Sequence, residues 1–202
     1  MFNNILTYFN KKNLKNKKYN FLFEEYDGDE VVVFDTETTG LNPKKDEIIS
    51  IGAVIIKNNK ILTSKSFEVF VTPKAGISKE SIKVHNIREC DLENAIDVKD
   101  GVGKFLKFIQ NRPLVGYYLE FDVKMINQVI KPWLGIVLPN KQIEVSGIYF
   151  DYKNRYIPQG HIDLTFATIL KNLNLPSLKV HNALNDAIMT AMIYVKLKNL
   201  IK

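Results

Sequence analysis

Three stretches of apolar residues near the start of the chain have the periodicity of β-strands. The first begins at Val31, the second is the β-branched run 48–56, and the third alternates from Ile61 to Val71. The segment 57–60, Lys-Asn-Asn-Lys, joins the last two and is typical of a tight hairpin turn. We therefore expect three successive strands that form an antiparallel meander.

The rest of the chain alternates between helical periodicity and short apolar strands. After Pro73 and Gly76 end the meander, Ser78 is expected to begin a short helix that carries His85 near its end. The later elements, in chain order, are a helix from Ile96 to Ile109 that is over by Pro113, a strand at 114–117, a helix from about Phe121 to Val129 that Pro132 stops, a strand at 143–145, and helices at 163–173 and 182–198. This order predicts one α/β domain whose mixed five-stranded sheet combines the antiparallel meander with parallel strands and is flanked by helices.

The first 29 residues differ in composition from the rest. Five lysines between Lys11 and Lys18 are separated mainly by asparagines, and the apolar run 21–23 follows them. We interpret residues 1–29 as a basic N-terminal extension and residues 30–202 as the functional domain, with 21–23 fastening the extension to the core. The extension is either a solvated, partly helical segment or a basic arm that contacts phosphates.

Composition and charge narrow the class of protein. With 202 residues, of which 46% are apolar, the chain can build one domain with a substantial core, and its formal charge of +6 favours an anionic partner such as nucleic acid. The single cysteine, Cys90, cannot form an intrachain disulfide, and three histidines without Cys-x-x-Cys pairs exclude a conventional structural zinc site. Asparagines interrupt the apolar residues at the N-terminus, and no stretch reaches transmembrane length. We expect a cytoplasmic protein without membrane contact.

Two carboxylates, Asp35 and Glu37, stand one residue apart at the end of the first predicted strand. Alternate side chains of a strand share a face, so these two project together, about 7 Å apart along the backbone. Their repulsion would weaken a plain structural sheet, and hard divalent cations such as Mg²⁺ or Mn²⁺ would relieve it. The alternative is that both acids lie on a solvated loop after the strand.

Two later segments supply further candidates. Asp122 follows the strand 114–117 at the start of the next helix, where amide donors and the helix dipole favour an anion. His181 precedes the last predicted helix, and Asp186 falls in its first turn. Taken alone, Asp122 is also consistent with an ordinary helix-start acid, and the His181–Asp186 pair with a cap and a surface acid.

Together these motifs resemble those of the DEDDh exonucleases, also called the DnaQ-like 3′–5′ exonuclease family, which have the ribonuclease H-like fold. Residues 35–41, Asp-Thr-Glu-Thr-Thr-Gly-Leu, are similar to the family's first motif, Asp-x-Glu-Thr-Thr-Gly-Leu. His181 with Asp186 is similar to the third motif, and Phe121-Asp122 after a Val-Gly strand is a shorter match to the second. The resemblance runs from about residue 31 to residue 197.

The resemblance implies hydrolysis of nucleotides from the 3′ end of a nucleic acid with two divalent metal ions, Mg²⁺ or Mn²⁺. Asp35 would bridge both ions, Glu37 and Asp186 would complete the shell of one, and Asp122 would hold the other, directly or through water. His181 would be the general base for the attacking water, because imidazole exchanges protons readily near neutral pH. We expect His181 in the loop before the last helix.

The resemblance also implies substrate-binding residues. Thr39, Gly40 and Leu41 would contact the terminal nucleotide, with Gly40 admitting the backbone and Leu41 wedging against the last bases. His85 would lie near the nucleotide, although Asn86 stands where relatives have Gly. Phe121 would pack on a sugar or base, or else in the core.

Four further residues, Tyr117, Tyr118, Trp133 and His161, have aromatic or imidazole side chains. Tyr117-Tyr118 departs from the His-Asn that relatives commonly carry, so polar contacts there are in doubt. His161 matches no motif and is expected at the surface, whereas Trp133 has apolar neighbours and is expected to anchor the core.

We therefore predict a metal-dependent 3′-to-5′ exonuclease that releases nucleoside monophosphates from the single-stranded or frayed 3′ end of DNA, in proofreading or repair. DNA is favoured over RNA. The alternatives are an exoribonuclease or oligoribonuclease of the same fold, and a catalytically silent nucleic-acid-binding or polymerase-associated module, against which the complete catalytic set argues. A DNA polymerase is a candidate partner. Because the chain ends soon after its last predicted helix, without a convincing clamp-binding peptide, the sequence is at least as consistent with a free-standing exonuclease as with a dedicated polymerase subunit.

Overall fold

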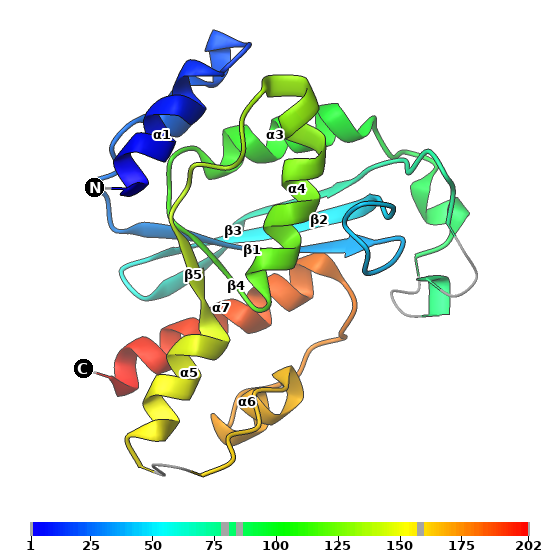
Figure 1. Ribbon diagram of the computed structural model, residues 1–202. Coiled ribbons are helices and arrows are strands. Elements are labelled where there is room, and N and C mark those ends of the chain that lie inside the picture. The colour runs from blue at the N-terminus through cyan, green and yellow to red at the C-terminus, as the bar shows by residue number, and fades with distance from the viewer. Residues whose placement is uncertain (1, 78–80, 84–86, 157–159, 202) are drawn as a thin grey trace.

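The computed structural model describes residues 2–77, 81–83, 87–156 and 160–201. Its sheet has five strands in the order β3-β2-β1-β4-β5 (Figure 1). The strands are β1 (Glu30–Thr38), β2 (Ile48–Lys57), β3 (Lys60–Phe70), β4 (Leu114–Gly116) and β5 (Gln142–Glu144). The first three form an antiparallel meander, and β4 and β5 add to β1 in parallel. The predicted mixed sheet is confirmed.

The turn between β2 and β3 is the predicted hairpin. Asn58 and Asn59 have φ angles of 50° and 59°. Both angles lie in the left-handed region that a type I′ turn requires at its two central positions and that asparagine tolerates well.

Helices cover both faces of the sheet (Figure 1). The helices are α1 (Phe2–Lys12), α3 (Val98–Ile109), α4 (Leu119–Leu134), α5 (Val145–Asn154), α6 (Phe166–Asn172) and α7 (Ala183–Leu200), with the 3-10 helices η1 (Lys17–Phe23) and η2 (Glu89–Leu92). Helices α3 and α4 pack on one face, and α5, α6 and α7 pack on the other. Because both faces are covered, β2 is buried at every position except its last, and Ser50 is the one polar residue before that end.

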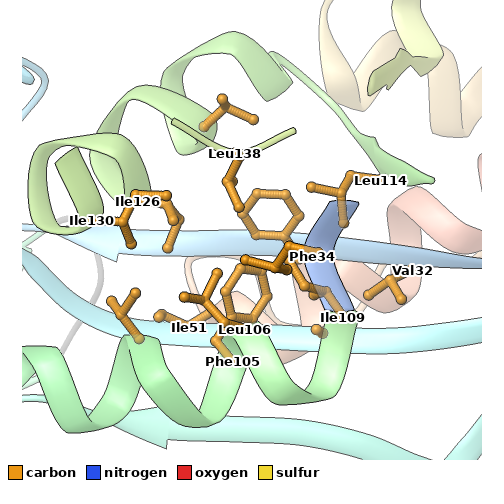
Figure 2. Packing of buried hydrophobic residues seen from close by; sticks show 14 of the residues in the cluster. Val32, Phe34, Ile51, Phe105, Leu106, Ile109, Leu114, Ile126, Ile130 and Leu138 are labelled. Carbon is orange, nitrogen blue, oxygen red and sulfur yellow. The ribbon is translucent and has the colours of Figure 1, made fainter. Parts of the chain in front are cut away.

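Alternation along β1 divides its side chains between the two cores. Val32 and Phe34 pack with Phe105 and Leu106 of α3 and with Ile126 of α4 (Figure 2). Val33, between them, belongs to the core on the α7 side. The same alternation continues into the acidic end of the strand, so Asp35 and Glu37 are directed to the α7 face and Thr36 to the α4 face.

The N-terminal segment packs against the domain. Leu14, Tyr19 and Leu22 are buried in the same core as α3 and α4, and Phe21 and Phe23 pack at its edge, as the sequence predicts for the run 21–23.

The prediction that Pro132 stops the helix is wrong. Helix α4 begins at Leu119 and continues through Pro132 to Leu134, and Gly135, with φ 76°, ends it. A proline in the last turn removes only one amide donor, and the terminal carbonyls are bonded from outside the helix. The backbone N–H of Lys15 donates to Leu134 O (3.0 Å), and its ammonium donates to Pro132 O (3.2 Å).

Capping residues also shorten two predicted helices. The helix α3 begins at Val98 because Asp97 accepts the amide of Lys99 (2.8 Å), so Ile96 instead forms a bridge with Val71. The helix α6 begins only at Phe166. The carboxylate of Asp163 accepts the amide of Thr165 and the hydroxyl of Thr168, which holds residues 163–165 in a turn before the helix.

Helix α5 follows β5 directly and was not predicted, because its apolar periodicity is weak. The short helix expected from Ser78, with His85, falls largely outside the described residues.

Candidate active site

The carboxylates of Asp35, Glu37 and Asp186 come together at the C-terminal end of β1. One ligand oxygen from each lies within 4.8 Å of the others. Asp35 and Glu37 share a face by strand alternation, and Asp186 comes from the first turn of α7, which packs on that face. Glu37 is buried, whereas Asp35 and Asp186 are half-buried.

Gly52 allows α7 to reach this position. It pairs with Asp35 across the sheet, and the start of α7 lies directly over it. A Cβ atom at Gly52 would overlap the backbone of Ala183 and Leu184. The missing side chain therefore sets how closely Asp186 approaches Asp35.

We expect Gly52→Ala to push α7 off the sheet. Overpacking of this kind costs about 1–3 kcal/mol of stability, and the displaced Asp186 should also weaken Mg²⁺ binding. Thermal unfolding with and without Mg²⁺ measures both effects. Gly147→Ala is the matched control, because nothing lies within 4 Å of a Cβ atom there. An unchanged unfolding temperature and Mg²⁺ response in Gly52→Ala would contradict this role.

The segment before α7 is held by its own side chains. Asn182 caps the helix by accepting the amide of Asn185 (2.9 Å), and Asp186 Oδ2 accepts the amide of His181 (2.9 Å). His181 lies in the loop before the helix, which confirms its predicted location, and its φ of 58° is left-handed. The carboxylate of Asp186 therefore positions the backbone of His181 and keeps its other oxygen, Oδ1, buried and without a hydrogen-bond partner.

Asp122 is fixed on the opposite face of β1. Its Oδ1 accepts both the amide of Thr36 (3.0 Å) and the hydroxyl of Thr36 (2.6 Å). Asp122 is buried and lines the same cavity as the other three acids, but its oxygens are not among the three that lie within 4.8 Å. The structure thus brings three of the four predicted metal ligands into one cluster and places the fourth beside it.

Glu144 orients the helix that carries Asp122. Its Oε2 accepts the amide of Leu119, the first residue of α4 (2.8 Å), while its Oε1 accepts the amide and hydroxyl of Ser146 at the start of α5 (3.1 and 2.8 Å). One carboxylate therefore caps two helices.

A cavity of about 590 Å³ opens over the acids. His181, Leu41, Tyr118 and Phe121 line it together with the four carboxylates. The side chain of Leu41 is 86% exposed and that of Tyr118 is 71% exposed. The Tyr118 and Phe121 rings are nearly parallel, with centroids 6.5 Å apart and planes at 19°.

Burial and mutual repulsion raise the pKa values of the acids. Burial, then the charges of Asp186 and Asp122, raise the pKa of Glu37 to about 8. Burial, then Asp122, Asp186 and Glu37, raise the pKa of Asp35 well above its usual range. Burial raises the pKa of Asp122 to about 7, although the Thr36 hydrogen bonds oppose the shift. Among the described residues, no Lys or Arg forms an ion pair with any of the four.

These shifts predict an unusual pH dependence for the metal-free protein. Because the pKa of Glu37 lies near 8 in the folded state and near its ordinary value of 4.5 when unfolded, the folded state binds more protons between these values. Stability should therefore fall as pH rises through this window, by on the order of 2 kcal/mol. We expect the unfolding temperature in EDTA to decrease from about pH 5 to about pH 8, and Mg²⁺ to restore it. A flat profile in EDTA would contradict the clustering.

Of the other predicted substrate-binding residues, Thr39 and Gly40 lie on the loop after β1. The backbone amide of Thr39 donates to Glu47 O (2.9 Å), and its hydroxyl donates to Asp46 and accepts from the Glu47 amide. Gly40 lies against the Asp46 carboxylate, which a Cβ atom would meet at 2.7 Å. His85 lies outside the described residues.

The predicted locations of His161 and Trp133 are confirmed. His161 is exposed. Trp133 is half-buried against the core and makes an edge contact with Tyr19, at a centroid distance of 5.5 Å.

Sequence reasoning missed Thr36, Gly52 and Glu144, and it named Tyr118 only as a departure from the family pattern. Strand alternation places Thr36 opposite Asp35 and Glu37, and a glycine within an apolar strand signals a close approach, so both had a detectable signal. The roles of Glu144 and Tyr118 depend on contacts with other elements or on a backbone angle, which local patterns do not show.

None of the helices in the described part of the chain has both the length and the apolar composition needed to cross a membrane.

Carboxylates gathered at the end of a central strand, under an open cavity, are a kind of site that metal-dependent nucleases use. Residues 32–194 match the family model described as "Exonuclease", and the chain belongs to this exonuclease family.

The chain is also similar in sequence to proteins of DNA polymerase III. The chain is 36% identical over 168 residues to DNA polymerase III PolC-type of Caldanaerobacter subterraneus subsp. tengcongensis, covering 83% of this chain and 11% of that protein. It is 29% identical over 166 residues to DNA polymerase III subunit epsilon of Aquifex aeolicus, covering 82% of this chain and 79% of that protein. The chain thus spans about a tenth of the PolC-type relative.

The fold is that of the DEDDh exonucleases, on the ribonuclease H-like architecture. The nuclease domain of 3'hExo, a DEDDh family member, solved bound to rAMP, superposes with a TM-score of 0.70 at 16% sequence identity, covering 87% of this chain and 94% of that one. The predicted fold and family are confirmed.

Proposed function

We propose that this protein is a metal-dependent 3′-to-5′ exonuclease that releases nucleoside monophosphates from a single-stranded or frayed 3′ end of DNA. The observation that carries the proposal is the meeting of Asp35, Glu37 and Asp186 within 4.8 Å, beside His181, in one open cavity. Membership of the exonuclease family supports the same reaction.

The acids suit a hard divalent cation. Asp186 Oδ1 is buried and has no hydrogen-bond partner. Burial, and then the neighbouring carboxylates, raise the pKa values of Asp35 and Glu37, and a bound cation would oppose both effects. All the donors are carboxylate oxygens, which Mg²⁺ and Mn²⁺ prefer. Asp35, Glu37 and Asp186 would hold one ion, and Asp122 would contribute to a second. When bound, the ions would offset the charge of the scissile phosphate and lower the pKa of the attacking water.

His181 would accept the proton of that water. Its backbone is fixed by Asp186, and its side chain is exposed at the cavity wall, where water reaches it. Its left-handed conformation is a strained one that the Asp186 hydrogen bond supports. Proton transfer to a positioned base contributes about 10²- to 10⁴-fold to such reactions.

Exposed apolar side chains would hold the terminal nucleotides. Leu41 and Tyr118 are largely exposed although they line the catalytic cavity, and Phe121 lies beside Tyr118. Thr39 and Gly40 are packed within their own loop, so their role would be to shape the turn that presents Leu41.

We expect Tyr118→Ala to raise KM for a single-stranded substrate by about 5- to 100-fold, because stacking of a base on an aromatic ring contributes about 1–3 kcal/mol. The value of kcat should change little, since the proposed contact is with a base and not with the reacting phosphate. Tyr118→Phe, which keeps the ring, should behave as the wild type. Steady-state kinetics on one strand separates the two constants, and an unchanged KM in Tyr118→Ala would count against stacking.

The direction of attack is tested with a strand labelled at its 5′ end. In Mg²⁺ the labelled products should form a ladder that shortens one nucleotide at a time, and the unlabelled product should be nucleoside monophosphate. EDTA should stop the reaction. Early appearance of internally cut fragments would indicate an endonuclease and overturn the proposal.

DNA is the proposed substrate because the relatives above are parts of DNA polymerase III. Matched DNA and RNA strands at one salt concentration decide the question. Faster hydrolysis of RNA would favour an exoribonuclease of the same fold. The same relatives support a DNA polymerase as partner, and copurification with a polymerase subunit would test it.

A further inference from the structure

The positive charge of this protein is concentrated at its N-terminus. Residues 1–23 contain five lysines and no aspartate or glutamate, so five of the six units of formal net charge lie in this segment. Residues 24–202, which carry every proposed site residue, are nearly neutral in sum. Electrostatic attraction for a polyanion therefore originates mainly outside the catalytic cavity.

The lysines are exposed on a fixed support. Lys11 and Lys12 lie in the last turn of α1, Lys17 and Lys18 lie at the start of η1, and all four are exposed. Leu14, in the connection between the two helices, is buried. No ion pair among the described residues involves these four lysines, which we call the basic platform.

Specific hydrogen bonds dock the support to the domain. The side chain of Asn10 donates to Val137 O (2.8 Å) and accepts the Val137 amide (3.0 Å), which reproduces a backbone pair. The amide of Lys15 caps α4 at Leu134, and Tyr19 packs edge-on against Trp133. The platform is therefore held in one orientation, so its lysines lose little chain entropy when they bind a ligand.

The basic platform lies apart from the catalytic cavity. Helix α1 stands at the upper left of Figure 1, beyond the C-terminal end of α4, whereas the first turn of α7 lies on the opposite side of the view. None of the four platform lysines is among the residues that line the cavity.

Aromatic side chains accompany the charge. Tyr8 and Phe9 of α1 are 63% and 55% exposed, and their rings form an edge contact with centroids 5.7 Å apart. Lysines with interleaved exposed aromatic rings are typical of surfaces that hold single-stranded nucleic acid without sequence preference.

We propose that the basic platform of Lys11, Lys12, Lys17 and Lys18 is a second contact site for the nucleic-acid substrate, which binds the phosphates of the strand upstream of the 3′ end. This inference rests on the proposed exonuclease function. It predicts that long strands are hydrolysed more efficiently than very short ones, and that this advantage decreases with salt.

The test replaces all four lysines with glutamine in the full chain and compares a DNA strand of about 30 nucleotides with a dinucleotide. On the long strand, kcat/KM at low salt should fall by about 10-fold or more. The slope of log(kcat/KM) against the logarithm of the salt concentration should become less negative by about 2–3, because each lost phosphate contact changes this slope by about 0.7. On the dinucleotide, kcat/KM should stay within about 2-fold of the wild type. Lys15 stays unchanged because it caps α4.

The matched control makes the same charge change on exposed lysines elsewhere, at Lys60, Lys171, Lys196 and Lys198. This control should retain both the long-strand rate and its salt dependence. Equal losses in the platform and control variants would show a general effect of net charge and overturn the site, as would an unchanged long-strand rate in the platform variant. If the wild-type protein hydrolyses neither substrate, the exonuclease proposal itself fails. Loss of polymerase binding alone, with normal strand hydrolysis, would assign the surface to a protein partner instead.

Discussion

Asp35→Asn should reduce kcat on single-stranded DNA by on the order of 10³-fold or more, because it removes a ligand and a negative charge from the centre of the acidic cluster. The same change should not destabilise the metal-free protein. Asp35 has a strongly raised pKa because burial and three neighbouring carboxylates disfavour its charge, so a neutral amide relieves repulsion. Kinetics in Mg²⁺ and thermal unfolding in EDTA measure the two effects.

This combination distinguishes a functional acid from a structural one. Asp163→Asn is the control for the loss of a carboxylate, since Asp163 is exposed, caps the turn before α6 and does not line the cavity. It should leave kcat unchanged. If Asp35→Asn lost stability in EDTA together with its activity, Asp35 would be a structural residue and the metal assignment would be undermined.

His181→Asn should reduce kcat by about 10²- to 10⁴-fold, the usual contribution of a positioned general base. Binding of Mg²⁺ should persist, because the link from residue 181 to Asp186 runs through a backbone amide that the substitution keeps. Asparagine also tolerates the left-handed φ of 58° at this position better than most residues do. Single-turnover rates and the Mg²⁺-dependent shift in unfolding temperature are the two measurements.

His161→Asn serves as the control for the loss of an imidazole, because His161 is exposed and does not line the cavity. It should keep full activity. Parallel losses of turnover and of Mg²⁺ response in His181→Asn would instead assign His181 to holding the site together.

Two residues that line the cavity have a left-handed backbone conformation. His181 and Tyr118 have φ angles of 58° and 55°, which are uncommon for residues with such side chains. Hydrogen bonds lie at or next to each residue. Asp186 accepts the amide of His181. Tyr117, which directly precedes Tyr118, donates its hydroxyl to Leu164 O (3.0 Å). Strain of this kind persists where the surrounding structure enforces it, and it presents both rings to the cavity.

The parts of the fold that depend on local pattern could be predicted from sequence. Strand alternation places Asp35 and Glu37 on one face, and helical periodicity places Asp186 in a first turn. The Asn-Asn hairpin signal requires only two adjacent residues. These signals, together with the order of the elements along the chain, were sufficient to predict the mixed sheet.

The parts that depend on contacts between distant segments could not be predicted in the same way. Helix α4 passes through Pro132 because Lys15 supplies donors to its end. Glu144 orients Asp122 through the first amide of α4, and Gly52 matters only because α7 folds over it. Each of these contacts joins residues far apart in sequence, and no local pattern marks the partner.

The central claim is that Asp35, Glu37 and Asp186 together bind a catalytic divalent cation. Direct titration of the purified protein with Mn²⁺, followed by the loss of the free-ion electron paramagnetic resonance signal, tests it for the wild type and for Asp186→Asn. We predict saturable binding to the wild type and at least about 10-fold weaker binding to the variant, as expected for loss of one ligand of the cluster. Equal Mn²⁺ binding by the two proteins would contradict the claim.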